Sequence, residues 1–251
     1  MNWLFLRGLT REQRHWGRFK MIFERDFEGS QVYCLDLPGT GTEVSRESPA
    51  TIPAIVNDLR DRWLALRAAT EGEWGLMSIS LGSMCGMNWV SRFENDFSRI
   101  VTINSSAANL SHLFKRLRPE MLGGVLKSGL LDRDPLLKER KILSMTTNHS
   151  QEVIYELAHE WANYAREAPV AKSTAVNQVM AAISFFAPQK IQIPMLVLSS
   201  ANDRFTHPDC SKDLATHFKS QLVVHESAGH DLPLEDSEWV VREVKKWMGK
   251  L

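Results

Sequence analysis

Three residues of the sequence have the types and the chain order that nucleophilic catalysis by a serine requires. Ser80 stands in the pentapeptide Ser78-Ile79-Ser80-Leu81-Gly82, which has the small-x-Ser-x-small form of a nucleophile elbow. In such an elbow the serine occupies a strained turn, and the residues two positions away are small because strand and helix backbones pass close together. A plain strand-to-helix turn would also fit these five residues, so the interpretation depends on partners for the serine.

Asp203 and His230 can supply these partners. A serine hydroxyl is a poor nucleophile until a base removes its proton, and the base needs an acid that fixes its tautomer. Asp203 follows the apolar run 195–199, and His230 follows the run 221–225, where Gly229 permits a tight turn. We therefore predict Ser80 as nucleophile, His230 as general base and Asp203 as the acid that orients the histidine.

Acyl transfer also needs donors for the developing oxyanion, and backbone N–H groups can supply them. We predict the amides of Leu81, which follows the nucleophile, and of Leu9, which follows the first apolar run. Gly8 would let the backbone turn so that the amide of Leu9 points toward Ser80. A simple glycine turn is the alternative interpretation.

Six short apolar runs could position these residues, and the intervals between them are long enough for helices. This pattern is typical of βαβ units and predicts an α/β fold with six parallel strands and helices on both faces. In such a sheet, ligands bind at the carboxyl ends of the strands, where Ser80, Asp203 and His230 fall. The runs are 3–6, 31–35, 74–79, 99–103, 195–199 and 221–225.

The interval 107–193 is much longer than one crossover needs and contains amphipathic stretches at 152–166 and 174–186. Unstructured loops of this length are uncommon in compact domains, so we predict a helical cap over the strand ends. Residues 1–106 and 194–251 would form the core. Candidates for an acyl pocket are Trp161, Tyr164 and Phe185 first, then Leu113, Phe114, Met121, Leu122, Met180 and Phe186, although such residues could simply pack the cap onto the sheet.

The composition restricts the function further. The chain has 251 residues, and its 30 basic and 30 acidic residues leave no net charge to attract nucleic acid or an acidic membrane. We expect a small organic partner, and the sequence leaves the oligomeric state open. The three cysteines form no CxxC pair, and the histidines lack ligand spacing, so neither a metal nor another cofactor is expected. The apolar opening 1–6 stops at Arg7 and is too short to span a bilayer, which favours a cytoplasmic protein.

Along nearly its whole length the chain resembles the α/β-hydrolase superfamily, and most of all its small capped carboxylesterases with a Ser-Asp-His triad. The resemblance rests on 6–9, His15-Trp16, 35–39, the Ser80 elbow, Asn202-Asp203 and 229–236. It implies a sheet that lacks the amino-terminal hairpin of larger members. Arg7 departs from the His-Gly that usually follows the first strand, and this departure leaves the backbone donor intact.

The residues and the resemblance together predict a serine hydrolase that cleaves a small to medium, largely apolar carboxylic ester through an acyl-enzyme. A thioesterase or lactonase would use the same triad. A hydrolase-fold protein that binds a ligand with little turnover is the alternative from another class, and Arg7 and Ser78 are the features that favour it.

Overall fold

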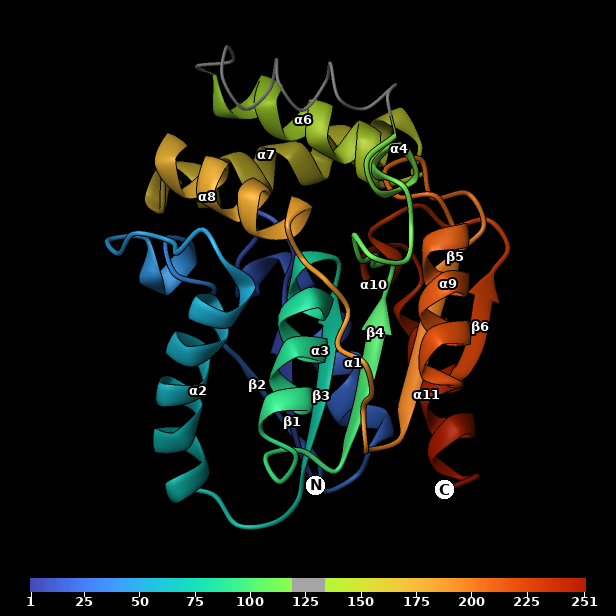
Figure 1. The fold of residues 1–251 in the computed structure, drawn as a ribbon. Helices are drawn as coiled ribbons and strands as arrows, with labels where there is room; N and C mark the ends of the chain where they lie inside the picture. The colour runs from blue at the N-terminus through green and yellow to red at the C-terminus, as the bar shows by residue number, and fades with distance from the viewer. Residues whose placement is uncertain (119–133) are drawn as a thin grey trace.

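The computed structural model describes residues 1–118 and 134–251, and six strands of this part form one sheet (Figure 1). All neighbouring strands pair in parallel, in the order β2-β1-β3-β4-β5-β6. The predicted α/β fold with six parallel strands is confirmed. The strands are β1 Asn2–Leu6, β2 Gln31–Cys34, β3 Trp74–Ile79, β4 Arg99–Ile103, β5 Met195–Ser200 and β6 Gln221–His225.

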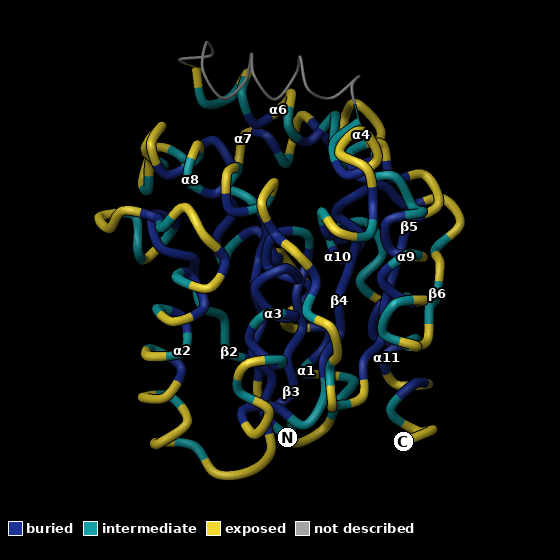
Figure 2. Tube along the Cα trace, viewed as in Figure 1, coloured by how far each residue is buried: buried dark blue, intermediate teal, exposed yellow. Residues whose placement is uncertain are grey.

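Helices cover both faces of the sheet, and each face has its own apolar cluster (Figure 2). On one face lie α2 (Ile52–Ala68), α3 (Leu81–Arg92) and α9 (Asp209–Phe218). On the other lie α1 (Phe19–Asp26) and α11 (Ser237–Met248). Both faces of the central strands are therefore dry, which explains why these strands appear in the sequence as continuous apolar runs.

The last helix, α11, begins at Ser237. The Asp236 side chain accepts a hydrogen bond from the N–H of Trp239 and so acts as an N-cap, outside the helix itself. Between β6 and this helix lies the short helix α10 (Leu232–Glu235), which directly follows the segment that contains His230.

The segment between β4 and β5 folds as helices α4 (Leu113–Arg116), α6 (Pro135–Thr146), α7 (Gln151–Glu167) and α8 (Lys172–Ile183). Figure 1 shows α6, α7 and α8 above the carboxyl ends of the strands. Helices α6 and α7 pack on each other around their own apolar cluster, which includes Leu143, Ile154 and Trp161.

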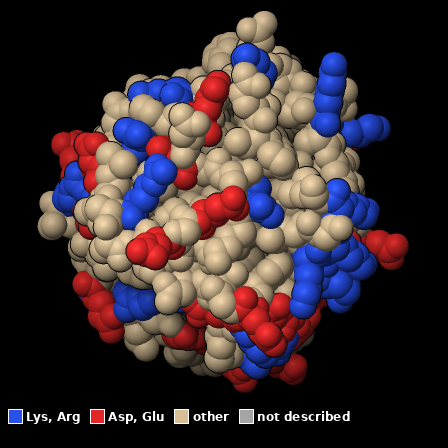
Figure 3. Space-filling model, turned by 90° about the horizontal axis from the view of Figure 1, so that it is seen from below, with Lys and Arg blue, Asp and Glu red and all other residues tan. Residues whose placement is uncertain are grey.

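Charges of both signs lie on the surface seen from the opposite end of the molecule, the end that faces away from α6 and α7 (Figure 3). Acidic and basic side chains are interspersed there with uncharged ones. No helix in the described part of the chain is long and apolar enough to cross a bilayer.

Candidate active site

Ser80 lies between β3 and α3 in a backbone conformation that side chains other than glycine rarely adopt, with φ 56° and ψ −120°. Its N–H donates to the carbonyl of Ile103 on the neighbouring strand at 2.9 Å. A Cβ at Gly82 would stand 2.5 Å from the carbonyl oxygens of Leu6 and Arg7. The small residue two positions after the serine is therefore required by the close approach of α3 to the end of β1.

The structure brings Asp203 and His230 together. Nδ1 of His230 lies 2.8 Å from Oδ2 of Asp203, while the other carboxylate oxygen accepts the N–H groups of Phe205 at 2.8 Å and Thr206 at 2.9 Å. With Nδ1 donating to the carboxylate, Nε2 of His230 is left as the basic nitrogen. Ser80 and His230 line the same cavity.

Two opposing effects act on the pKa of His230. Burial is the largest single effect and lowers it, but the charge and the hydrogen bond of the Asp203 carboxylate, together with the charge of Asp231, raise it, and the pKa of His230 lies above its ordinary value. The charge of Arg7 opposes the rise. A raised pKa makes the histidine a stronger base once it is neutral.

The predicted oxyanion donors lie beside Ser80. A Cβ built on Gly8 would be 3.1 Å from Cβ and 3.6 Å from Oγ of Ser80, so the loop after β1 passes directly against the serine. Leu9 and Leu81 line the same cavity as Ser80. The amide of Leu81 is the first of α3 and has no intrahelical acceptor, and that of Leu9 has no acceptor among the described residues. Gly8 is needed for this close approach rather than for a positive φ, since its φ is not among the positive ones.

Asn104 is a structural part of the site that the sequence analysis missed. It follows β4 with φ 44°, is buried, and donates its amide to Oγ of Ser200 at 3.0 Å and to the carbonyl of His230 at 2.8 Å. Its Oδ1 accepts the N–H of Ser200 at 2.9 Å. Asn104 thus ties the end of β5 to the loop that carries the histidine. The one feature of the sequence that could have indicated this role is the position of Asn104 directly after the predicted strand 99–103.

Arg7 forms a buried ion pair with the residue that follows the histidine. Its Nη1 and Nη2 lie 3.0 and 2.6 Å from Oδ1 and Oδ2 of Asp231, and its guanidinium carbon lies 4.8 Å from the ring centre of Trp16. Both partners of the pair are nearly inaccessible to solvent. Arg7 therefore connects the end of β1 to the His230 segment through its side chain.

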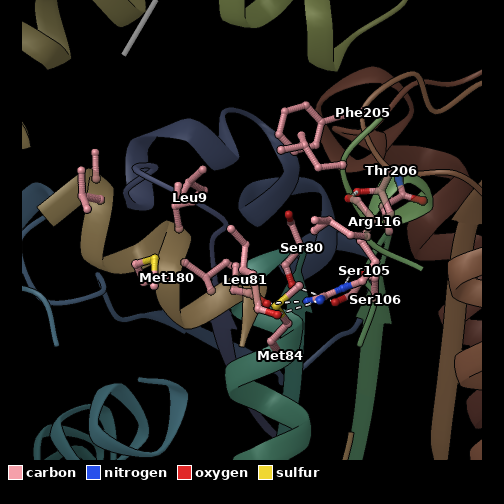
Figure 4. Close-up of a pocket in the computed structure, with 18 of the residues that line it drawn as sticks. Leu9, Ser80, Leu81, Met84, Ser105, Ser106, Arg116, Met180, Phe205 and Thr206 are labelled. Atoms are coloured by element: carbon pink, nitrogen blue, oxygen red, sulfur yellow. Dashed lines mark hydrogen bonds between the residues drawn. The ribbon is translucent and has the colours of Figure 1, made fainter. Parts of the chain in front are cut away.

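Two cavities meet at Ser80. The larger, about 280 Å³, extends under α8 and is almost entirely apolar, and the smaller, about 130 Å³, includes His230 and part of α6. Figure 4 shows Leu9 and Met180 on one side of Ser80 in the larger cavity, and Arg116, Ser105 and Ser106 on the other. Among the described residues, no cluster of three or more His, Cys, Asp or Glu side chains could hold a metal ion.

The three aromatic residues predicted to line the acyl pocket lie elsewhere. Trp161 is buried in the cluster between α6 and α7, with its ring edge-on to His15 at 4.5 Å. Tyr164 lines a separate cavity beside His15. Helix α8 ends at Ile183, one turn earlier than predicted, and Phe185 consequently turns into the core on the sheet.

Two of the other candidates do line the larger cavity, namely Leu113 and Met180. Phe114 and Phe186 are exposed. Met121 and Leu122 lie outside the described residues. The remainder of the apolar wall comes from the inner side of α8 and from Met84, Leu117 and Phe205.

The parallel sheet, the serine in a strained strand-to-helix turn and the buried Asp203–His230 pair together define an α/β-hydrolase. Within that superfamily the chain belongs to the serine aminopeptidase S33 family, whose model matches residues 10–237. Comparison with curated protein sequences found no match.

Several solved structures share this fold. A thermophilic esterase from Thermogutta terrifontis, with malate bound, superposes with a TM-score of 0.74 at 18% identity over 100% of this chain and 90% of that one. A putative lipase from Acinetobacter baumannii superposes with a TM-score of 0.75 at 20% identity, over 99% of this chain and 83% of the lipase. A hydrolase from Oleispira antarctica superposes with a TM-score of 0.76 at 17% identity, over 100% of this chain and 91% of the hydrolase.

Proposed function

We propose that this protein is a serine esterase that cleaves a small carboxylic ester through an acyl-enzyme. The observation that carries the proposal is the buried Asp203–His230 pair in the same cavity as a serine held at φ 56°. The description of one structural neighbour as an esterase and of another as a putative lipase is consistent with it.

In the proposed mechanism the Ser80 hydroxyl attacks the ester carbonyl while Nε2 of His230 accepts its proton. The amides of Leu9 and Leu81 stabilise the oxyanion. His230 then protonates the leaving alcohol, the acyl group stays on Ser80, and a water molecule activated by His230 releases the acid. Asp203 stabilises the imidazolium formed in both steps.

The surroundings of the serine favour an ester over a peptide with a free amino terminus. An aminopeptidase has to hold a positively charged ammonium group beside the scissile bond, which calls for carboxylates. Among the described residues, the one acidic side chain that lines the two cavities at Ser80 is that of Asp231, and Arg7 neutralises it. The basic residues that line them are Arg7, Arg11, Arg116, Lys138 and Lys172.

The apolar cavity under α8 supports an acyl group of small to medium size. At about 280 Å³ it lies at the lower end of the usual range for ligand pockets, and none of the described residues that line it is acidic. We propose residues 107–193 as the cap that supplies most of these walls. Thioesters and lactones would meet the same groups, so they remain alternative substrates.

Aryl esters of graded acyl length test the proposal. We expect the purified protein to hydrolyse 4-nitrophenyl acetate, butyrate and octanoate much faster than buffer alone does. The acyl chain length with the highest kcat/KM should be the one that fits the 280 Å³ cavity. The amino-acid 4-nitroanilides that aminopeptidases cleave should be turned over far more slowly. Absence of ester hydrolysis at every chain length would instead support a ligand-binding protein with little turnover.

A further inference from the structure

The position of His230 distinguishes the two cavities at Ser80. His230 lines the smaller cavity and is not among the residues that line the larger one. Because the histidine has to protonate the leaving oxygen, the alcohol part of an ester lies on the histidine side of the serine. The larger, apolar cavity then receives the acyl group, and the smaller one receives the leaving group.

More basic than acidic residues line the smaller cavity among those that the structure describes. Its acidic residue, Asp231, is fully engaged by both terminal nitrogens of Arg7. Two further cations line the same space, Arg11 from the loop after β1 and Lys138 from α6. Arg11 is paired with the buried carboxylate of Glu139. Lys138 is therefore the cation on the leaving-group side of Ser80 that has no carboxylate partner among the described residues.

Arg11 and Lys138 have unused hydrogen-bond donors. Nη1 of Arg11 donates to Glu139 at 2.7 Å, but its buried Nη2 has no acceptor among the described residues. Lys138 is half-buried, and in the part of the chain that the structure describes its ammonium forms neither a hydrogen bond nor an ion pair. Buried and half-buried cationic donors without acceptors are costly, and a ligand that supplies acceptors removes that cost.

We propose that the leaving group of the natural substrate carries an anion, a carboxylate or a phosphate, which binds Lys138 with support from Arg11. The proposal rests on the esterase function proposed above and adds the chemical class of the alcohol or thiol that is released. Charge-assisted hydrogen bonds to such an anion form at short range in a site partly shielded from water, where they are strong.

Two butyrate esters that differ in one charge provide the test. 4-Nitrophenyl butyrate releases an uncharged ring, whereas 5-butyryloxy-2-nitrobenzoate releases the same nitrophenol with an added carboxylate. The measured quantity is the ratio of kcat/KM for the anionic ester to that for the neutral one, since any general loss of activity cancels in this ratio. We expect Lys138→Met to lower the ratio about tenfold, equivalent to about 1.4 kcal/mol.

Arg140→Met is the matched control. Arg140 is exposed on the same helix, lines neither cavity and stands two positions from Lys138, so its side chain points away from that of Lys138. We expect Arg140→Met to leave the ratio unchanged. An equal fall in both variants, or no fall in Lys138→Met, would overturn the proposal.

Competition identifies the anion. Benzoate and phenyl phosphate are tested as inhibitors of neutral ester hydrolysis, and the one that inhibits more strongly in the parent and loses more inhibition in Lys138→Met identifies the source. If the parent hydrolyses neither ester, the proposed function fails. If it hydrolyses the neutral ester but Lys138→Met leaves the ratio unchanged, only the anionic leaving group is refuted.

Discussion

Replacement of Arg7 by methionine should destabilise the fold strongly. The substitution removes both hydrogen bonds to Asp231, of 3.0 and 2.6 Å, and keeps an apolar side chain against Trp16. Side-chain exposure is 4% for Arg7 and 6% for Asp231, so the carboxylate would remain buried without a partner. Breaking a buried pair in this way costs about 3–5 kcal/mol.

This cost is large beside the total stability of a domain, about 5–15 kcal/mol. For a chain of this size it corresponds to a fall in Tm of about 6–20 °C. The assay is chemical denaturation followed by tryptophan fluorescence, with thermal unfolding alongside. Arg25→Met is the control, because Arg25 also contacts a carboxylate, that of Glu238, but both side chains are more than half exposed. Its variant should lose far less stability.

The double variant Arg7→Met/Asp231→Asn separates the loss of the Arg7–Asp231 ion pair from the cost of leaving the Asp231 carboxylate buried without a partner. Without the carboxylate, no charge is left buried alone, so the double variant should be more stable than Arg7→Met by about 1 kcal/mol or more. An Arg7→Met variant within about 1 kcal/mol of the parent would refute the reasoning, because that result would mean that Asp231 is not desolvated in solution.

Further predictions concern the histidine, the short helix α10 that follows it, and the elbow. Asp203→Asn removes the carboxylate that raises the pKa of His230, so the acidic limb of the kcat/KM profile should move to lower pH while the rate falls. Burial raises the pKa of Glu235 to about 7, so its contribution to stability is present at pH 5 and lost as the pH rises through 7. The free energy of unfolding of the parent relative to Glu235→Gln should therefore fall by on the order of 1 kcal/mol between pH 5 and 8, once solvent screening of this half-buried group is allowed for. Gly82→Ala should lower soluble yield and activity, because its methyl group would stand 2.5 Å from two carbonyl oxygens, whereas Gly249→Ala, with its nearest atom at 3.6 Å, should be tolerated in both respects.

Three outcomes would contradict these predictions. A pH profile of Asp203→Asn with its acidic limb at higher pH would show that the carboxylate does not set the pKa of His230. A constant stability difference between the parent and Glu235→Gln from pH 5 to 8 would place the pKa of Glu235 outside that range. A fully active Gly82→Ala would mean that α3 and β1 can separate at the elbow.

The sheet could be predicted from the sequence because its central strands are buried on both faces and the strands are connected by helices. Each central strand is then a largely apolar run, and the polar residues after the runs mark one edge of the sheet. Ser80, Asp203 and His230 could be predicted to lie close together because each follows a different run, and the structure places them at the same end of the sheet.

The interactions that hold the site together could not be predicted in this way. Arg7 and Asp231 are 224 positions apart, and neither belongs to a local pattern that indicates the other. Asn104 acts through hydrogen bonds to segments that follow two later strands. Their pairing depends on three-dimensional proximity, which residue type and spacing do not encode.

The pocket assignments failed for a different reason. An aromatic residue on an amphipathic helix can face a ligand cavity or a neighbouring helix, and periodicity is the same in both cases. Helices α6 and α7 need a core of their own, and Trp161 occupies it. Phe185 lies beyond the end of α8, where Arg116 donates to the carbonyls of Ala182 and Ile183.

Labelling by a fluorophosphonate, combined with ester hydrolysis, tests the serine mechanism most directly. The parent should be labelled at Ser80 and should hydrolyse 4-nitrophenyl butyrate, and Ser80→Ala should lose both while keeping its fold, because alanine is small enough for the elbow. Loss of a triad nucleophile leaves little beyond the contribution of the oxyanion donors, so the rate should fall by several orders of magnitude. Ser91→Ala, farther along α3, should behave as the parent. An Ser80→Ala variant that kept the parent's rate, or a parent that hydrolysed esters without being labelled, would contradict the proposal that Ser80 is the nucleophile.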